Sequence, residues 1–553
     1  MKVFFLFKEK YMNYLPKSLA VGFVLASFAA SSVLAAGTHP VTGEALSDDQ
    51  TFTYSMLDEF TSADPQIVED VEGSWFVRDL FEGLMNQDAD GNLIPGVATG
   101  YTTNEAKDVY TFTLRDNARW SDGNQVTAHD FVYAWRRLAD PATASPYSWF
   151  AEIMALENVG AVMSGESPPE ALGIRALDNL TLEVRLTASL PYFAAMTTHA
   201  STYPTPQWTV KTFGDDWTKP GNIVGNGAYV LTEHIPNETA TRERNSLYWN
   251  NDATIINKVV TLIMNDENTD FTRWEAGETD RGAIPSGQYP RLKAQYPEEA
   301  ISFPRLCTYY YTFNLSPSGQ DALQDVRVRQ ALSYALDRSV VTDKILQGGQ
   351  IQAFTFTPGA TAGFEVPAVA FGQMTQDERN AKAKELMAEA GYGPDNPLSV
   401  EVMYNTSEGH KKIAIAVQQM WKETLGVKAT LANQEWKTFL KTRGGQNFDI
   451  ARGGWCGDYN EASTFLDLLT TPSGYNDGKF SNAEVDELMT SARTMSDATS
   501  NYTRVEEILA NEMPVIPVYH YTGVFMLRKN VKGWPFNNVE QNIYSRDLYK
   551  VAD

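Results

Sequence analysis

The chain has 553 residues, of which 43% are hydrophobic, and its formal net charge is −24. At about 100 to 200 residues per domain this length predicts two to four domains, and the apolar content is sufficient for large cores. A charge this negative argues against nucleic acid and anionic lipid as partners. It also fits a well-solvated surface, so composition alone identifies no ligand.

The N-terminus has the pattern of an export signal. Four lysines make its first residues basic: Lys2, Lys8, Lys10 and Lys17. An apolar segment at 19–30 and small residues before Ala35 complete the pattern, so we expect cleavage after Ala35, with Ala36 as the alternative. The apolar segment is short for a membrane span, which argues against an anchor. We therefore expect a signal peptide at 1–35 and export through the Sec pathway.

Strand-like and helix-like segments are mixed along the chain, which indicates the α/β class. Residues 110–115 and 181–186 alternate apolar and polar side chains as half-buried strands do. A helix is predicted from Asp325 onward. A capping box at Thr375 predicts a second helix that ends at Gly391, and apolar spacings of three and four predict a third over 408–424.

The chain contains two cysteines, Cys307 and Cys456. In an exported protein an even pair favours one disulfide, and two buried free thiols are the alternative. The closed loop would be long, because the two residues are 149 positions apart. In the chain-entropy model such a closure stabilises the fold by about 5 kcal/mol.

Four blocks of sequence resemble, in order, the solute-binding proteins of peptide and nickel ABC importers. Residues 110–137 read YTFTLRDNARWSDGNQVTAHDFVYAWRR, 222–230 read NIVGNGAYV, 244–250 read RNSLYWN and 325–338 read DVRVRQALSYALDR. The blocks span most of the chain that remains after cleavage. The resemblance implies a two-lobed α/β binding-protein fold of the large Venus-flytrap type, in which a hinge closes the lobes over a ligand.

The resemblance also implies how the chain divides into domains. The first lobe is expected to be discontinuous, built from 36–81, 207–306 and 523–553. An extra domain at 82–206 would be attached to it. The second lobe would run over 307–522, and the hinge would lie where the chain crosses between the lobes.

Further segments resemble the oligopeptide-binding branch of that family. They include CTYYY at 307–311, NQEWKTF at 433–439 and FDIARGGWCGDYNE at 448–461. The resemblance implies a monomeric periplasmic receptor that captures peptides of about three to five residues and delivers them to an inner-membrane ABC permease. No cofactor is expected. Cys307 and Cys456 match the positions of that branch's disulfide, which would lie within the second lobe.

A free peptide is a zwitterion, so a receptor that encloses it must neutralise an ammonium at one end and a carboxylate at the other. Asp458 is the candidate acid, and by resemblance it binds the N-terminal amine. Arg443 and Arg452 are the candidate cations, because arginine presents a bidentate fork and keeps its charge. By resemblance these two meet the carboxylates of peptides of different lengths.

The remaining site residues are carried over by resemblance alone. They are Glu69, Tyr147, His410, Trp436, Gly454, Trp455, Cys456 and Tyr521. Two positions depart from the oligopeptide-binding branch. Arg305 replaces a tyrosine, and Gln347 replaces a lysine that helps to bind longer peptides. Hydrogen bonds to the ligand backbone ignore side chains, so we expect length selectivity with weak sequence selectivity.

Motifs and composition argue against several other functions. The chain has no G-x-S-x-G, H-E-x-x-H or Walker loop, so we expect no enzyme activity. With six histidines and two cysteines we expect no metal site, and haem or nickel as ligand would favour more histidines. Dipeptides and murein peptides remain alternatives, because their receptors belong to the same family.

Overall fold

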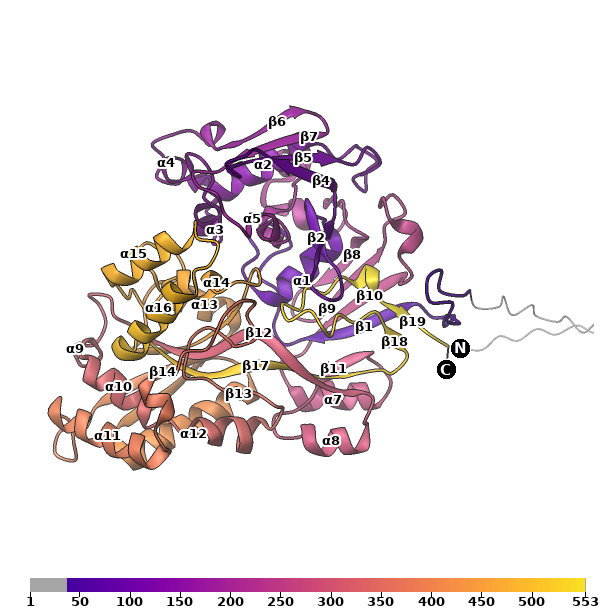
Figure 1. Ribbon diagram of the computed structural model, residues 1–553. Coiled ribbons are helices and arrows are strands. Elements are labelled where there is room, and N and C mark those ends of the chain that lie inside the picture. The colour runs from indigo at the N-terminus through magenta and orange to yellow at the C-terminus, as the bar shows by residue number, and fades with distance from the viewer. Residues whose placement is uncertain (1–36, 553) are drawn as a thin grey trace, which may run out of the picture.

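The computed structural model describes residues 37–552, so the predicted signal peptide at 1–35 lies outside the described residues. Two long strands, β12 (Ala300–Phe313) and β17 (Val515–Leu527), run side by side across the molecule and pair antiparallel (Figure 1). They are neighbours in the middle of an 11-stranded sheet of order β15-β14-β16-β12-β17-β11-β1-β10-β9-β8, with β13 beside β17. The two strands therefore join the two halves of the sheet.

One half of the sheet continues from β12 through three strands. These are β16 (Ile450–Cys456), β14 (Ser399–Asn405) and β15 (Lys428–Gln434), and the short β13 (Ile351–Gln352) pairs with β17. The helices of this half are α9 (Asp321–Gln324), α10 (Val326–Tyr334), α11 (Gln376–Glu389), α12 (Glu408–Leu425), α13 (Trp436–Gly444), α14 (Ser463–Leu466), α15 (Ala483–Ala492) and α16 (Thr499–Glu512). Helices α10 to α12 pack on the sheet as Figure 1 shows at lower left.

The other half continues from β17. Its strands are β11 (Arg281–Ala283), β1 (Thr51–Met56), β10 (Lys258–Ile263), β9 (Thr239–Arg244) and β8 (Tyr229–Ile235). Its helices are α1 (Val71–Leu80), α7 (Glu267–Glu275) and α8 (Tyr289–Gln295), and two short hairpins pair β2 (Met85–Gln87) with β3 (Leu93–Pro95) and β18 (Val531–Lys532) with β19 (Tyr549–Lys550).

A separate four-stranded antiparallel sheet lies at the top of Figure 1. In spatial order it contains β4 (Ala98–Thr103), β5 (Val109–Leu114), β7 (Thr181–Arg185) and β6 (Ile174–Asp178). The helices around it are α2 (Ala128–Ala139), α3 (Ser148–Ile153), α4 (Val159–Met163), α5 (Phe193–Met196) and α6 (Gln207–Phe213). The domain boundaries at 82, 207, 307 and 523 stay predictions.

The elements predicted from local pattern are confirmed. The strand predictions at 110–115 and 181–186 correspond to β5 and β7. Asp325 caps α10, and the capping box at Thr375 opens α11 with both of its reciprocal bonds. Between residues 37 and 552, no helix combines the length and the apolar character needed to cross a membrane.

The pairing of β12 with β17 is interrupted at the place where the hinge is predicted. The register shifts between Pro304 and Thr308, so Pro304 faces Thr522 whereas Thr308 faces His520. Such an irregularity bends a strand and increases its twist. On the side of Thr308, the predicted disulfide is confirmed: Cys307 and Cys456 face each other on β12 and β16 and are bonded.

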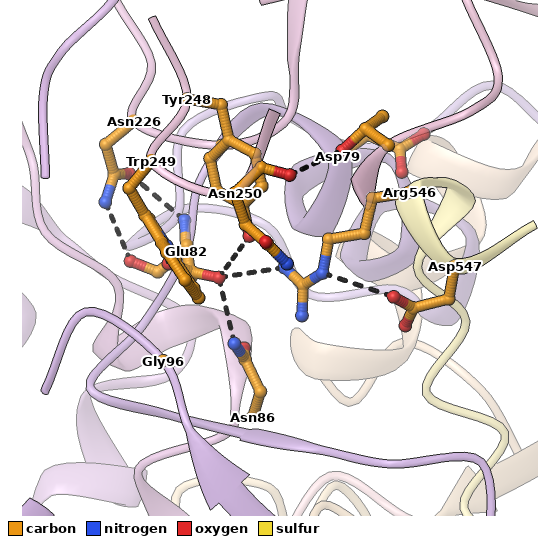
Figure 2. Close-up of polar contacts among 12 residues, drawn as sticks. Asp79, Glu82, Asn86, Gly96, Asn226, Tyr248, Trp249, Asn250, Arg546 and Asp547 are labelled. Atoms are coloured by element: carbon orange, nitrogen blue, oxygen red, sulfur yellow. Dashed lines mark hydrogen bonds and ion pairs between the residues drawn. The ribbon is translucent and has the colours of Figure 1, made fainter. Parts of the chain in front are cut away.

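A buried carboxylate, Glu82, connects distant segments of the chain (Figure 2). Its Oε1 accepts hydrogen bonds from Asn86 Nδ2 at 2.9 Å and from Tyr248 OH at 2.6 Å. The same oxygen forms an ion pair with Arg546, whose Nη1 lies 3.1 Å away. Its Oε2 accepts from Trp249 Nε1 at 2.5 Å. The sequence block at 244–250 therefore serves the fold, because it supplies two of the donors that satisfy this buried charge.

Candidate ligand-binding site

A cavity of about 200 Å³ lies between α1 on one side and β16, α13 and the loop after β16 on the other. All eleven residues predicted for the site line it. They are Glu69, Tyr147, His410, Trp436, Arg443, Arg452, Gly454, Trp455, Cys456, Asp458 and Tyr521. The structure thus brings the predicted acid and both predicted cations into one cavity.

Asp458 marks the acidic end of this cavity and is 8% exposed. Its Oδ1 lies 3.4 Å from Tyr147 OH and 3.4 Å from His199 Nε2, and its backbone N–H donates to Thr464 Oγ1. Within the described residues, its buried Oδ2 has no hydrogen-bond partner. Burial raises the pKa of Asp458 to about 8. The Oδ2 atom of this carboxyl group is therefore free to accept a hydrogen bond from a ligand.

His199 does not neutralise Asp458. Burial lowers the pKa of His199 well below its usual value, so the imidazole is uncharged at neutral pH. The 3.4 Å contact between His199 Nε2 and Asp458 Oδ1 is therefore not an ion pair at that pH, although its length would allow one. The ring stacks on Tyr147, with centroids 4.9 Å apart, and helps to hold the wall of the cavity.

Arg452 marks a cationic position on β16 and is 8% exposed. Its Nη2 donates to Tyr521 OH at 2.6 Å and its Nη1 to Asn405 Oδ1 at 3.3 Å, and the guanidinium lies 4.9 Å from the ring centroid of Tyr309. Asp58 forms no direct hydrogen bond to this group, and the Asn405 amide donates to Asp58 Oδ2 at 3.4 Å. Within residues 37–552 the Arg452 guanidinium forms no ion pair, and its Nε has no partner.

Arg443 differs from Arg452 because it already has an acidic partner. Its Nε donates to Asp477 Oδ2 at 2.6 Å, and both side chains are largely buried. The two arginines were predicted from sequence to play equivalent roles, and their surroundings are not equivalent. Gln347 is not among the residues that line the cavity, and its amide donates to the carbonyl of Lys344.

Gly454 lies between the acidic and the cationic positions on β16. A Cβ atom at this residue would lie 2.6 Å from Arg452 Nη2, so any larger residue would displace the guanidinium. The glycine therefore leaves the guanidinium and the adjacent backbone accessible from the cavity.

The other predicted residues form the walls. Trp455 packs against Tyr475, with ring centroids 5.3 Å apart, and donates its indole N–H to the carbonyl of Thr464 at 2.8 Å. Glu69 Oε2 accepts from Tyr475 OH at 3.2 Å, and burial raises the pKa of Glu69. Burial also lowers the pKa of His410, so this side chain contributes no charge at neutral pH.

Several residues that line the cavity were missed from sequence. They are Asp58, Glu72, Trp75, Arg78, His199, Asn405, Tyr475, Glu540 and Asn542. They come from several separate segments, among them the loop after β1, α1, the end of β14, the loop between α14 and α15 and the C-terminal segment, so no local spacing connects them with β16. Throughout residues 37–552, no group of three or more His, Cys, Asp or Glu side chains is arranged to hold a metal ion.

Comparison with known proteins places the chain among binding proteins. The periplasmic murein peptide-binding protein MppA of Escherichia coli is 43% identical over 92% of this chain and 95% of its own length. The periplasmic oligopeptide-binding protein OppA of Salmonella typhimurium is 41% identical over 97% of this chain and 99% of its own length. The predicted resemblance to the oligopeptide-binding branch is thus confirmed.

Two solved structures of MppA show how the lobes are arranged. The structure of the E. coli murein tripeptide binding protein MppA gives a TM-score of 0.89 at 42% identity, over 92% of this chain and 100% of that chain. The unliganded open form of MppA gives only 0.67 at the same identity, over 92% and 98% of the two chains. Both are structures of one protein, so the present structure is more similar to the first than to the unliganded open form.

The predicted two-lobed α/β fold is therefore confirmed. Residues 92–477 match the family model described as bacterial extracellular solute-binding proteins, family 5 Middle, which accounts for more than half of the chain. The relatives cover nearly all of the rest. This protein belongs to family 5 of the bacterial extracellular solute-binding proteins.

Proposed function

We propose that this protein is the periplasmic receptor of an ABC importer for short peptides, which it captures free and hands to the membrane permease. The observation that carries the proposal is the pair of incompletely satisfied buried groups, the carboxyl group of Asp458 and the guanidinium of Arg452. A zwitterionic ligand supplies an ammonium to the first and a carboxylate to the second, and so removes the cost of two buried unpaired groups.

The spacing of these two residues suits a short peptide. They are six positions apart along the chain, which places their Cα atoms at most about 20 Å from each other. An extended peptide of three to five residues spans about 10 to 17 Å. The Asp458 and Arg452 side chains would reach toward the ligand and bridge the distance that remains between its ends and the two Cα atoms. The ligand backbone would then lie beside Gly454, where the strand has no side chain in the way.

We propose that the peptide is enclosed by a hinge movement at β12 and β17. The register shift between Pro304 and Thr308 and the low TM-score against the open form of MppA support this proposal. The relatives are named as periplasmic and as binding proteins. Accordingly, we place the mature protein in the periplasm and expect it to bind its ligand without converting it.

Murein peptide is the second candidate ligand, because MppA shares 43% identity with this chain. Both candidates present a free amine and a free carboxylate, so the charges at Asp458 and Arg452 suit either.

Native mass spectrometry of the protein purified without denaturation tests the proposal and separates the two candidates. A ladder of bound masses that fragment as ordinary peptides of about three to five residues is expected. Bound masses that contain diaminopimelate would identify murein peptide. A protein that carries no peptide and takes up neither class when it is added would contradict the proposed function.

A further inference from the structure

A second cavity, of about 220 Å³, adjoins the first one. Trp75, Arg305 and His410 line both, so the two spaces meet at these side chains. Arg281 lines the second cavity only. Nothing in the proposed capture of the peptide termini uses these two arginines.

Arg305 lies on β12 within the interrupted pairing and is largely enclosed. Its Nη2 approaches Cys456 Sγ at 3.9 Å, and its guanidinium lies 5.7 Å from the ring centroid of Trp75. Across the part of the chain that the structure describes, Arg305 makes no ion pair, and its buried Nε has no hydrogen-bond partner. A guanidinium has five N–H donors, and it is unusual for so few of them to form hydrogen bonds inside a protein.

Arg281 lies on β11 and faces the same indole. Its guanidinium is 5.6 Å from the Trp75 centroid, its Nη1 donates to the carbonyl of Ser55 at 3.2 Å, and its buried Nε is likewise without a partner among residues 37–552. Burial lowers the pKa of both arginines, as expected where desolvation is not offset by a paired acid. Two cations thus share one aromatic side chain in one cavity.

The acids around this cavity do not neutralise the two arginines. Glu267 also lines the cavity, but its Oε2 accepts from the backbone N–H of Ser286 at 3.0 Å and from the Ser286 hydroxyl. Glu72 and Asp270 act on the arginines only through longer-range attraction and form no ion pair with either. Among residues 37–552, neither guanidinium is therefore directly paired with an acid.

We propose that this cavity receives an internal carboxylate of the bound peptide, so that the receptor prefers ligands with an acidic group between their termini. This inference rests on the proposed function. The position follows from the contact of Arg305 with Cys456, which lies between Arg452 and Asp458 in the chain. A carboxylate there gains charge-assisted hydrogen bonds from guanidinium groups that are otherwise unsatisfied.

An internal carboxylate has two chemical sources. It is the side chain of an acidic residue in an ordinary peptide, or the free α-carboxylate that remains when glutamate is joined through its side chain. The arginines recognise the same group in both cases. The tripeptides Ala-Glu-Ala and Ala-γ-Glu-Ala distinguish the sources, and Ala-Gln-Ala provides the uncharged reference for both.

Calorimetric titration of these three peptides tests the inference. Wild type should bind at least one of the two acidic peptides about 10- to 100-fold more tightly than Ala-Gln-Ala. Replacement of both Arg281 and Arg305 by Gln should reduce that ratio to about one, whereas Arg305→Lys should retain most of it. Arg291→Gln, which removes an exposed arginine on α8, should leave the ratio unchanged. Melting curves check that each variant is folded.

The two possible failures are distinguishable. If wild type binds all three peptides with equal affinity, the second cavity does not bind an internal carboxylate, and the proposed receptor function stands. If wild type binds none of the three, the proposed function is overturned and the inference with it. A preference that persists when both Arg281 and Arg305 are replaced by Gln would assign it to other residues and contradict the present proposal.

Discussion

Two buried carboxylates of this protein have opposite surroundings. Glu82 is 1% exposed and accepts hydrogen bonds from three side chains and an ion-paired one from Arg546 (Figure 2). Asp458 is 8% exposed, one of its oxygens has no partner among the described residues, and its pKa is raised to about 8. The chain satisfies the first carboxylate itself and leaves the second incompletely satisfied.

The difference separates a structural charge from a ligand-binding charge. A buried charge that its own chain satisfies stabilises one conformation, whereas one left unsatisfied is a cost that a ligand can remove. The same contrast holds for two arginines of the cavity. Arg443 is paired with Asp477, and Arg452 forms no ion pair within the described residues.

The largest effect on stability is expected at Glu82. Glu82→Ala leaves Arg546 buried without its partner and should lower the free energy of unfolding by about 3 to 5 kcal/mol, measured by urea denaturation. Glu105→Ala, at an exposed position, serves as the matched control and should change stability by less than about 0.5 kcal/mol. Equal stability of the two variants would mean that the Glu82 cluster does not hold the fold together.

The two arginines should differ next most strongly, and in ligand affinity. Arg452→Ala removes the cation that has no acid of its own, so the affinity for trialanine should fall by about 2 to 5 kcal/mol, or 30-fold and more. Arg443→Ala should weaken binding less and instead lower stability, because Asp477 loses its partner. Titration calorimetry and melting curves on both variants measure the two effects. The reverse pattern would mean that Arg443 is the carboxylate-binding residue.

The pH dependence of binding tests the raised pKa of Asp458. Below pH 8 the free carboxyl group is protonated and must release a proton when it pairs with the ligand's ammonium, so affinity should fall by up to about tenfold per pH unit. Above pH 8 the peptide amine loses its own proton, since its pKa is about 8. Affinity for trialanine should therefore be greatest near pH 8. Calorimetry in buffers of different ionisation enthalpy should detect about one released proton at pH 6.5.

The same pKa predicts an effect on the stability of the ligand-free protein. The folded Asp458 holds its proton up to about pH 8, whereas the unfolded carboxyl group loses it near pH 4. The contribution of this group is therefore fully present below pH 4 and is lost as the pH rises toward 8. Asp458→Asn should show a flatter loss of stability between pH 5 and 8 than wild type. Parallel pH profiles would contradict the raised pKa.

The sequence was informative where a motif carries the site. The strand and loop at 450–458 hold Arg452, Gly454, Trp455, Cys456 and Asp458 in one continuous block, so a single resemblance located five of the lining residues. Helix caps such as Thr375 could be predicted from the sequence because each depends on three or four adjacent residues.

The rest of the site depends on contacts between distant segments. The pairing of Arg443 with Asp477 joins two separate segments of the second lobe, and the position of His199 beside Asp458 arises only when the extra domain and the second lobe pack. No local pattern distinguishes a satisfied arginine from an unsatisfied one. For the same reason, Arg305 was visible in the sequence only as an unexpected residue, and its position against Trp75 required the structure.

The most direct test of the central claim compares free and N-acetylated trialanine by titration calorimetry at pH 7.5. Acetylation removes the ammonium and leaves Asp458 without a partner, so wild type should bind the acetylated peptide about 30-fold or more weakly. Asp458→Asn should lose this discrimination while it remains folded. Equal affinity of wild type for the two peptides would show that Asp458 is not the partner of the ligand's amine.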